Sequence, residues 1–140
     1  MNNGSLSIYV SDSPNSMVSA VYITFSSIEI HGNQSGWVNY TIGERTVNIF
    51  GTSVNNSVLL GNISLQPGKY TMIKLYITSV VVNMGGNNVT FNLSSNFAFI
   101  NHPFTIQPHE NVKLIVEFKL NECLNMQSRV FTPYIGVIEK

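Results

Sequence analysis

Hydrophobic and polar positions alternate along most of the chain. Near the start, the apolar residues Leu6, Ile8 and Val10 are separated by Ser7 and Tyr9. Side chains on a β-strand point alternately to its two faces, so this period of two predicts a half-buried strand. Similar segments, rich in β-branched and aromatic residues, continue to the end of the chain, and together they predict about nine strands. They cover residues 18–30, 37–42, 45–50, 69–82, 89–91, 97–100, 104–106, 112–120 and 130–138.

Turn-forming residues, mainly Gly, Asn and Pro, separate these segments. Residues 53–60 alone fit a short helical turn. Strands joined by such turns form antiparallel sheets, and each sheet has to bury one face. A chain of 140 residues of which 44% are apolar has the size of one domain. The sequence therefore predicts an all-β fold over residues 1–140: a single antiparallel β-sandwich, immunoglobulin-like or prealbumin-like, with a Greek key.

Two turns contain residues with a structural role. Asp12 and Pro14 end the first strand, and we expect Asp12 to accept backbone N–H bonds in an Asx-type turn. Coordination of calcium by Asp12 and loop carbonyls is the alternative. Pro67 fixes φ and Gly68 permits a positive φ, which predicts a type II turn before the longest strand. Tyr70 then starts that strand, where its hydroxyl fits a tyrosine corner.

Asn-x-Ser/Thr sequons occur about twice as often as chance predicts. The chain has seven of them, whereas random placement of its Asn, Ser and Thr residues would give about three. N-glycans are attached to this motif in exported proteins. The sequence therefore predicts an extracellular or cell-surface glycoprotein. The candidate glycosylation sites are Asn3, Asn33, Asn39, Asn55, Asn62, Asn88 and Asn92.

Charged residues are few and balanced. Seven basic side chains match seven acidic ones, and neither sign is concentrated in any stretch. The sequence therefore predicts neither nucleic acid nor an anionic membrane as a partner. Asn outnumbers Lys 18 to 5. An acidic habitat would explain this, because protonated carboxylates leave Lys and Arg repelling one another. A surface-layer or pilus-like composition is the alternative explanation.

The first five residues have neither the basic nor the apolar region of a signal peptide, and no apolar run has the length of a membrane span. We expect a mature domain without its leader or anchor, which itself makes no contact with the membrane. Cys123 is the single cysteine, so an intramolecular disulfide is excluded. Glu122 precedes Cys123 and no His or Lys adjoins it, which predicts an inert thiol.

Metal ligands and catalytic groups do not form a recognisable pattern. His102, His109, Cys123 and Met126 are the ligand types of a blue-copper site, but that motif places a histidine between the cysteine and the methionine. A zinc site at His102 and His109 lacks evident third and fourth ligands. We therefore predict no cofactor and no metal.

Groups for hydrolysis are also sparse. Asp12 is the only aspartate, and there is no Gly-x-Ser-x-Gly elbow. The glutamates are interpreted as solvated surface rather than as an acid–base pair, so the sequence predicts no enzyme. They are Glu29, Glu44, Glu110, Glu117, Glu122 and Glu139. Trp37, Tyr40, Phe131 and Tyr134 are interpreted as core or glycan-supporting residues, with an aromatic platform for sugar as the alternative.

Several stretches together resemble one family, an uncharacterised domain of secreted archaeal and bacterial proteins with D-A-P and L-P-A-G-x-Y motifs. The matching segments are the first strand into residues 12–14, residues 47–50, 59–61 and 65–75, and the closing residues 116–118 and 132–134. The resemblance implies a prealbumin-like or immunoglobulin-like sandwich that is exported and often anchored, without an established activity. Lys119 stands where the family commonly has an acidic residue, so the resemblance implies no cation site there.

The sequence fits two main functions. The favoured one is a non-catalytic cell-surface binding, adhesion or scaffold domain, with other cell-surface proteins or carbohydrate as partners. The alternative is a self-associating subunit of a filament or surface layer, in which residues 6–10 form an edge strand exchanged between neighbours by strand addition. A secreted hydrolase comes third.

Overall fold

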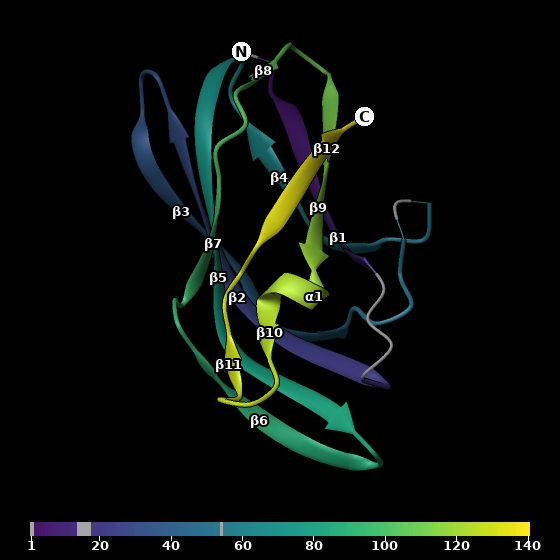
Figure 1. Cartoon of the computed structure of the whole chain (residues 1–140). Coiled ribbons are helices and arrows are strands. Elements are labelled where there is room, and N and C mark those ends of the chain that lie inside the picture. Colours follow the sequence, from purple (N-terminus) through teal and green to yellow (C-terminus); the bar gives the residue numbers. More distant parts are fainter. Residues whose placement is uncertain (1, 14–17, 54) are drawn as a thin grey trace.

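Two β-sheets face each other in the computed structural model, which describes residues 2–13, 18–53 and 55–140 (Figure 1). Sheet A has the strand order β12 (Ile135–Glu139), β9 (Asn111–Lys119), β1 (Gly4–Ser13), β4 (Val58–Leu65). Sheet B has the order β10 (Leu124–Asn125), β11 (Val130–Phe131), β6 (Asn87–Leu93), β5 (Gly68–Met84), β2 (Ala20–Gly32), β3 (Gly36–Asn48). Two further strands, β7 (Phe97–Ile100) and β8 (Phe104–Ile106), also pair with β5, and α1 (Leu120–Cys123) is a single helical turn. The predicted all-β sandwich is confirmed.

The described residues form twelve strands, whereas the sequence predicted about nine. The predicted strands 37–42 and 45–50 are one strand, β3, which ends at Asn48. It continues through Gly43, which has a φ of 72° and lies opposite a register shift in β2. Pro133 has no N–H to donate to a ladder, and the last predicted strand is divided there into β11 and β12.

Strand β4 was missed, because residues 53–60 were expected to form a helical turn. Its buried residues are Leu60, Ile63 and Leu65, which are spaced by three and then by two positions. The irregular spacing reflects a bulge in the pairing of β4 with β1. A bulge adds one residue to a strand and so interrupts the period of two.

The sheets are mixed, and the prediction of purely antiparallel sheets was wrong. Strand β1 is parallel to β9, and β11 is parallel to β6. Strand β1 also pairs with β4, so residues 6–10 lie inside sheet A. The expectation of an exposed edge strand at residues 6–10 was therefore wrong as well.

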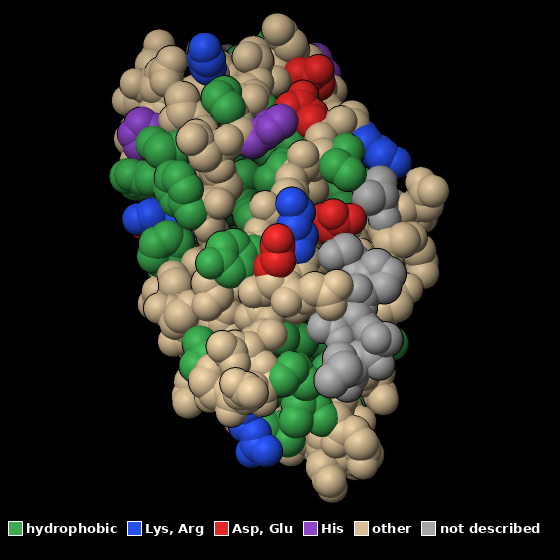
Figure 2. Space-filling view, in the orientation of Figure 1, with side chains coloured by type: hydrophobic (Ala, Val, Ile, Leu, Met, Phe, Trp, Pro, Cys, Tyr) green, Lys and Arg blue, Asp and Glu red, His purple; other side chains and the backbone are tan. Residues whose placement is uncertain are grey.

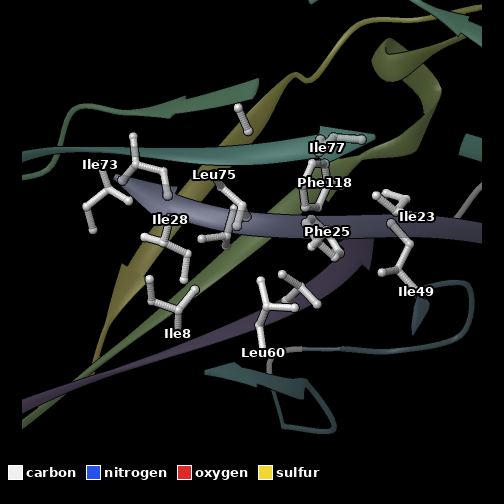
Figure 3. Packing of buried hydrophobic residues seen from close by; sticks show 14 of the residues in the cluster. Ile8, Ile23, Phe25, Ile28, Ile49, Leu60, Ile73, Leu75, Ile77 and Phe118 are labelled. Carbon is white, nitrogen blue, oxygen red and sulfur yellow. The ribbon is translucent and has the colours of Figure 1, made fainter. Parts of the chain in front are cut away.

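The core lies between the two sheets. Figure 3 shows Ile8 and Leu60 of sheet A pointing toward Ile28 and Leu75 of sheet B. All four are buried, with at most 1% of their surface exposed. Because inward and outward residues alternate on each strand, this apolar layer fixes which side chains point away from the core.

The turn at Pro67 and Gly68 starts β5 as expected, with one difference in geometry. Gly68 has a positive φ of 152°, which favours glycine but is far from the roughly 80° of a type II turn. The hydroxyl of Tyr70 donates a hydrogen bond of 2.7 Å to the carbonyl of Gln66, and its ring stacks on Phe104 at 5.4 Å. The predicted tyrosine corner is confirmed.

Asp12 is hydrogen-bonded to a segment about forty positions away in the sequence. Its buried carboxylate accepts a hydrogen bond of 3.1 Å from the N–H of Gly51, and its own N–H donates to Thr52 Oγ1 at 3.0 Å. The expected Asx-type turn involves Pro14, which lies outside the described residues. Burial raises the pKa of Asp12, the Gly51 N–H opposes this rise, and the charge of Glu117 adds to it.

Candidate functional site

The outward side of sheet B has an unusual concentration of rings and charges. Strand alternation turns Ile28, Ile30 and other buried residues inward, so their neighbours point outward. We call this surface the aromatic face. It comprises Glu29, His31, Trp37, Lys74, Tyr76, Phe97 and Phe99, from β2, β3, β5 and β7.

The strand register arranges these residues in rows across the sheet. Trp37 lies opposite His31 on β2. In the next row, Asn39 pairs with Glu29, Glu29 with Lys74, and Lys74 with Phe99. Tyr76 and Phe97 pair in the third row. Directly opposite residues point to the same side of a sheet, so all of these side chains share one surface.

Lys74 connects the two ends of the aromatic face. Its Nζ lies 4.7 Å from the ring centroid of Trp37 and 5.1 Å from that of Phe97. The His31 ring meets the Trp37 ring edge-on at 5.2 Å, and its Nδ1 is hydrogen-bonded to Thr71 Oγ1 at 2.9 Å. Cation–π and edge contacts of this kind hold the rings in defined positions on the surface.

Glu29 and Tyr76 form a polar pair at the centre of the aromatic face. The Tyr76 hydroxyl donates a hydrogen bond of 2.5 Å to Glu29 Oε1. This bond to the carboxylate raises the pKa of Tyr76, and burial adds to the rise. Tyr76 also packs against Phe97, with ring centroids 5.7 Å apart.

The aromatic face is open to solvent. Trp37 is 39% exposed and Phe99 is 43% exposed, which are high fractions for large apolar side chains. Figure 2 shows hydrophobic side chains beside Lys or Arg and His side chains along the left edge of the molecule, over β3 and β7. Exposed rings beside carboxylate, ammonium and imidazole groups are suited to stacking on a flat ligand and forming hydrogen bonds at its rim.

The four aromatic residues considered for a sugar platform do not lie on one surface, and two of them belong to or pack against the core, as the preferred interpretation expected. Trp37 belongs to the aromatic face, but Tyr40 points to the opposite side of β3 and packs against the core. Phe131 is fully buried, and Tyr134 is 52% exposed in the connection between β11 and β12. The sequence reasoning missed Lys74, Tyr76, Phe97 and Phe99, although their outward positions in alternating strands were a usable signal.

All seven candidate glycosylation sites are exposed. They lie before β1 (Asn3), in the β2–β3 turn (Asn33), on β3 (Asn39), in the β3–β4 connection (Asn55), on β4 (Asn62) and on β6 (Asn88 and Asn92). Among the other asparagines of the described residues, all but Asn83 are exposed too. Each sequon asparagine is therefore accessible to glycosylation. Exposure alone, however, does not distinguish the sequon asparagines from the other asparagines.

The candidate metal ligands are distributed over separate parts of the fold. His102 Nε2 contacts Glu139 Oε1 at 2.8 Å, and His109 lies in a turn with a φ of 63°. Cys123 is buried and donates to the Tyr134 carbonyl at 3.3 Å, and burial raises its pKa to about 11, so the prediction of an inert thiol is supported. Within the part of the chain that the structure describes, no three His, Cys, Asp or Glu side chains form a possible metal cluster.

The fold and this surface define an all-β sandwich domain with an exposed aromatic face on one sheet. The family model of DUF4382, a domain of unknown function, matches residues 3–133, and the chain belongs to this family. No curated protein and no solved structure matches the chain. In residues 2–13, 18–53 and 55–140, no helix is long and apolar enough to span a membrane.

Proposed function

We propose that this chain is an extracellular, glycosylated cell-surface module that binds a partner through the aromatic face and has no catalytic activity. The observation behind this proposal is the exposed ring of Phe99, which lies beside the ring of Phe97 and the ammonium of Lys74. An apolar surface that is left open on a sandwich with a complete core is typical of an interaction site. In this proposal the protein is exported by an archaeal cell, and its partner is carbohydrate or another cell-surface protein.

The positions of the titratable groups support a binding role over hydrolysis. Asp12 is bonded to Gly51 at the end of β1, Glu29 to Tyr76 on sheet B, and Glu139 to His102 near the C-terminus. These carboxylates are on different elements, and each already has a partner. A hydrolase needs an acid and a base that converge on one substrate, so it remains the third candidate.

Binding to the surface of the source cells tests the proposal. We expect the fluorescently labelled chain to bind, and the double variant K74A/F99A to bind about tenfold less, because one ring and one cation together contribute on the order of 1–2 kcal/mol. Tyr134→Ala is the matched control, since Tyr134 is exposed but lies off the aromatic face. Equal binding by the wild type and the double variant would contradict the proposal.

A filament or surface-layer subunit is the second candidate, and one observation favours it. Strands β3 and β4 are edge strands of opposite sheets and border a groove of about 640 Å³. The groove offers Tyr40, Ile42 and Ile63 to an added strand. Arg45 opposes such addition at one end, because its Nη1 donates to the β4 carbonyls of Leu59 and Leu60 at 3.1 and 3.2 Å.

Light scattering after size-exclusion chromatography separates the two candidates. A surface module elutes as a monomer or a discrete dimer at all concentrations. A subunit assembled by strand addition forms a polydisperse series whose mass rises with concentration, and that result would replace the first proposal with the second.

A further inference from the structure

We propose that the glycan on Asn39 docks on the indole ring of Trp37 and covers one end of the aromatic face. This inference rests on the glycosylation in the proposed function. It adds a position for one glycan and a role for the tryptophan beside it. The sugar is attached when the Asn39 Nδ2 replaces the phosphate leaving group of a lipid-linked oligosaccharide and loses one proton to the medium.

The strand geometry places the sequon and the ring on one surface. Trp37, Asn39 and Thr41 alternate with inward-facing residues of β3, so all three point outward. Residues two positions apart on a strand are about 7 Å apart, which is roughly the span of one sugar ring. In the unmodified chain the Asn39 Nδ2 is 3.5 Å from Ser27 Oγ, on the side of Asn39 away from Trp37, so docking of the glycan requires the Asn39 side chain to rotate.

The Trp37 ring is in contact with side chains of β2 and β5, His31 and Lys74. Lys74 belongs to the row that contains Asn39, through its pairing with Glu29, and its Nζ is 4.7 Å from the Trp37 centroid. Trp37 still has 39% of its surface exposed, which leaves area for a sugar to cover. The C–H face of a sugar stacks on an aromatic ring, and Glu29 and His31 lie beside it to bond the hydroxyl and acetamido groups.

The other six sequons lack this arrangement. The residues two positions before them are Met1, His31, Ser53, Leu60, Gly86 and Thr90, so Trp37 is the only Phe, Trp or Tyr in that position. His31 precedes Asn33, but Asn33 lies in the β2–β3 turn and not on a strand. Asn92 is the closest comparison, because it is exposed on β6 and is preceded by the exposed Thr90.

Covering Trp37 has two consequences for the molecule. It shields the part of the aromatic face on the edge strand β3 and leaves Tyr76, Phe97 and Phe99 on β5 and β7 open to a partner. It also places a bulky polar group at the groove between β3 and β4, which Asn39 and Asn62 both line. A glycan there obstructs the pairing of a further strand with the edge.

Fluorescence tests the inference directly, because Trp37 is the only tryptophan of the chain. The wild type, N39Q and N92Q are produced in a glycosylating host and in bacteria, and intact mass gives the occupancy of each sequon. We expect the acrylamide quenching constant of the glycosylated wild type to be about half that of the bacterial protein, because the sugar buries ring surface. N39Q from the glycosylating host should return to the bacterial value, whereas N92Q should keep the low value.

A thermal cycle adds a second readout. Glycosylation at Asn39 should raise the Tm of the wild type by about 3 °C. In Trp37→Ala this rise should disappear, because the glycan then has no ring to dock on. The rise contributed by a glycan at Asn92 should be the same with and without Trp37.

The outcomes distinguish this inference from the proposed function. An occupied Asn39 with unchanged quenching and a Tm rise that persists in Trp37→Ala overturns the docking alone. An Asn39 that is bare in the native protein, or stays unoccupied in the glycosylating host, overturns the inference while other occupied sequons keep the proposed function. Seven bare sequons in the native protein overturn both.

Discussion

Side chains on the outward side of sheet A are hydrogen-bonded to one another, whereas the outward side of sheet B has exposed aromatic rings. On sheet A, Asn111 donates hydrogen bonds to Ser5 Oγ and Ser7 Oγ at 2.7 and 3.1 Å, and Asn62 donates to Ser7 Oγ at 2.7 Å. We call this group, completed by Asn3 bonded to Ser64 Oγ at 3.1 Å, the polar ladder. On sheet B, the aromatic face leaves Trp37 and Phe99 open to water.

The two surfaces follow from the same alternation of residues but have different consequences. A ladder of amides and hydroxyls exchanges hydrogen bonds internally and with water, and it gains little from a partner. Exposed rings lose unfavourable contact with water when a ligand covers them. The polar ladder is therefore a solvated surface, whereas the aromatic face fits the proposed interaction site. Beyond the ladder, sheet A also has exposed apolar side chains, since Leu59 and Ile138 are 42% and 38% exposed.

The largest expected effect is a difference in stability between a core variant and a variant of the aromatic face. Phe118 is fully buried, with its ring centroid 6.1 Å from Phe25 and 6.2 Å from Phe131. Phe118→Ala should lower the free energy of unfolding by about 3–5 kcal/mol, because it leaves a cavity. Phe99→Ala removes an exposed ring and should cost less than about 0.5 kcal/mol.

Urea denaturation of both variants checks this difference. Both replace phenylalanine by alanine in sheet strands, so propensity effects are matched. A loss of several kcal/mol in Phe99→Ala would mean that the aromatic face is a structural element, and the comparison between the two faces would break.

A smaller effect separates the polar ladder from the aromatic face. Asn111→Ala removes two hydrogen bonds of the ladder and should cost about 1 kcal/mol of stability, without changing binding to the source cells. Lys74→Ala should do the opposite: little change in stability and weaker cell binding. Denaturation and cell binding are measured on both variants. If Asn111→Ala reduces cell binding as much as Lys74→Ala does, sheet A takes part in binding.

The smallest expected effect concerns acid. The folded-state pKa of Asp12 is raised by burial, so the stability linked to this group is full below its unfolded pKa and is lost as the pH rises through the folded pKa. Asp12 therefore favours the fold in acid, and denaturant midpoints at pH 3 and pH 7 should be close. Asp12→Asn keeps an acceptor for the Gly51 N–H and should reduce the part of the pH dependence that comes from this carboxyl. Collapse of the wild type at pH 3 would show that other carboxylates form structural ion pairs.

Much of the fold was predictable because burial imposes a period of two on strands. That period located β1, β2, β5 and β9 to within a few residues. It did not locate β4, whose bulge interrupts the alternation, and it could not show that β9 runs parallel to β1. Strand direction depends on pairing between segments more than 100 positions apart, and no local pattern records it.

The site was less predictable than the fold. Trp37 was named, since a tryptophan two positions before a sequon is visible in the sequence. Lys74 and Phe97 contribute only because β5 brings β2 and β7 together on one sheet. Asp12 also has its partner, Gly51, at a distance of 39 positions, where turn rules that consider neighbouring residues do not reach.

Peptide mapping of the protein purified from its native organism is the decisive test of glycosylation. We expect carbohydrate on several of the seven exposed sequon asparagines, with Asn39 among them. Native protein in which every sequon asparagine is bare would contradict the account, because the main argument for a glycosylated, extracellular module would be lost.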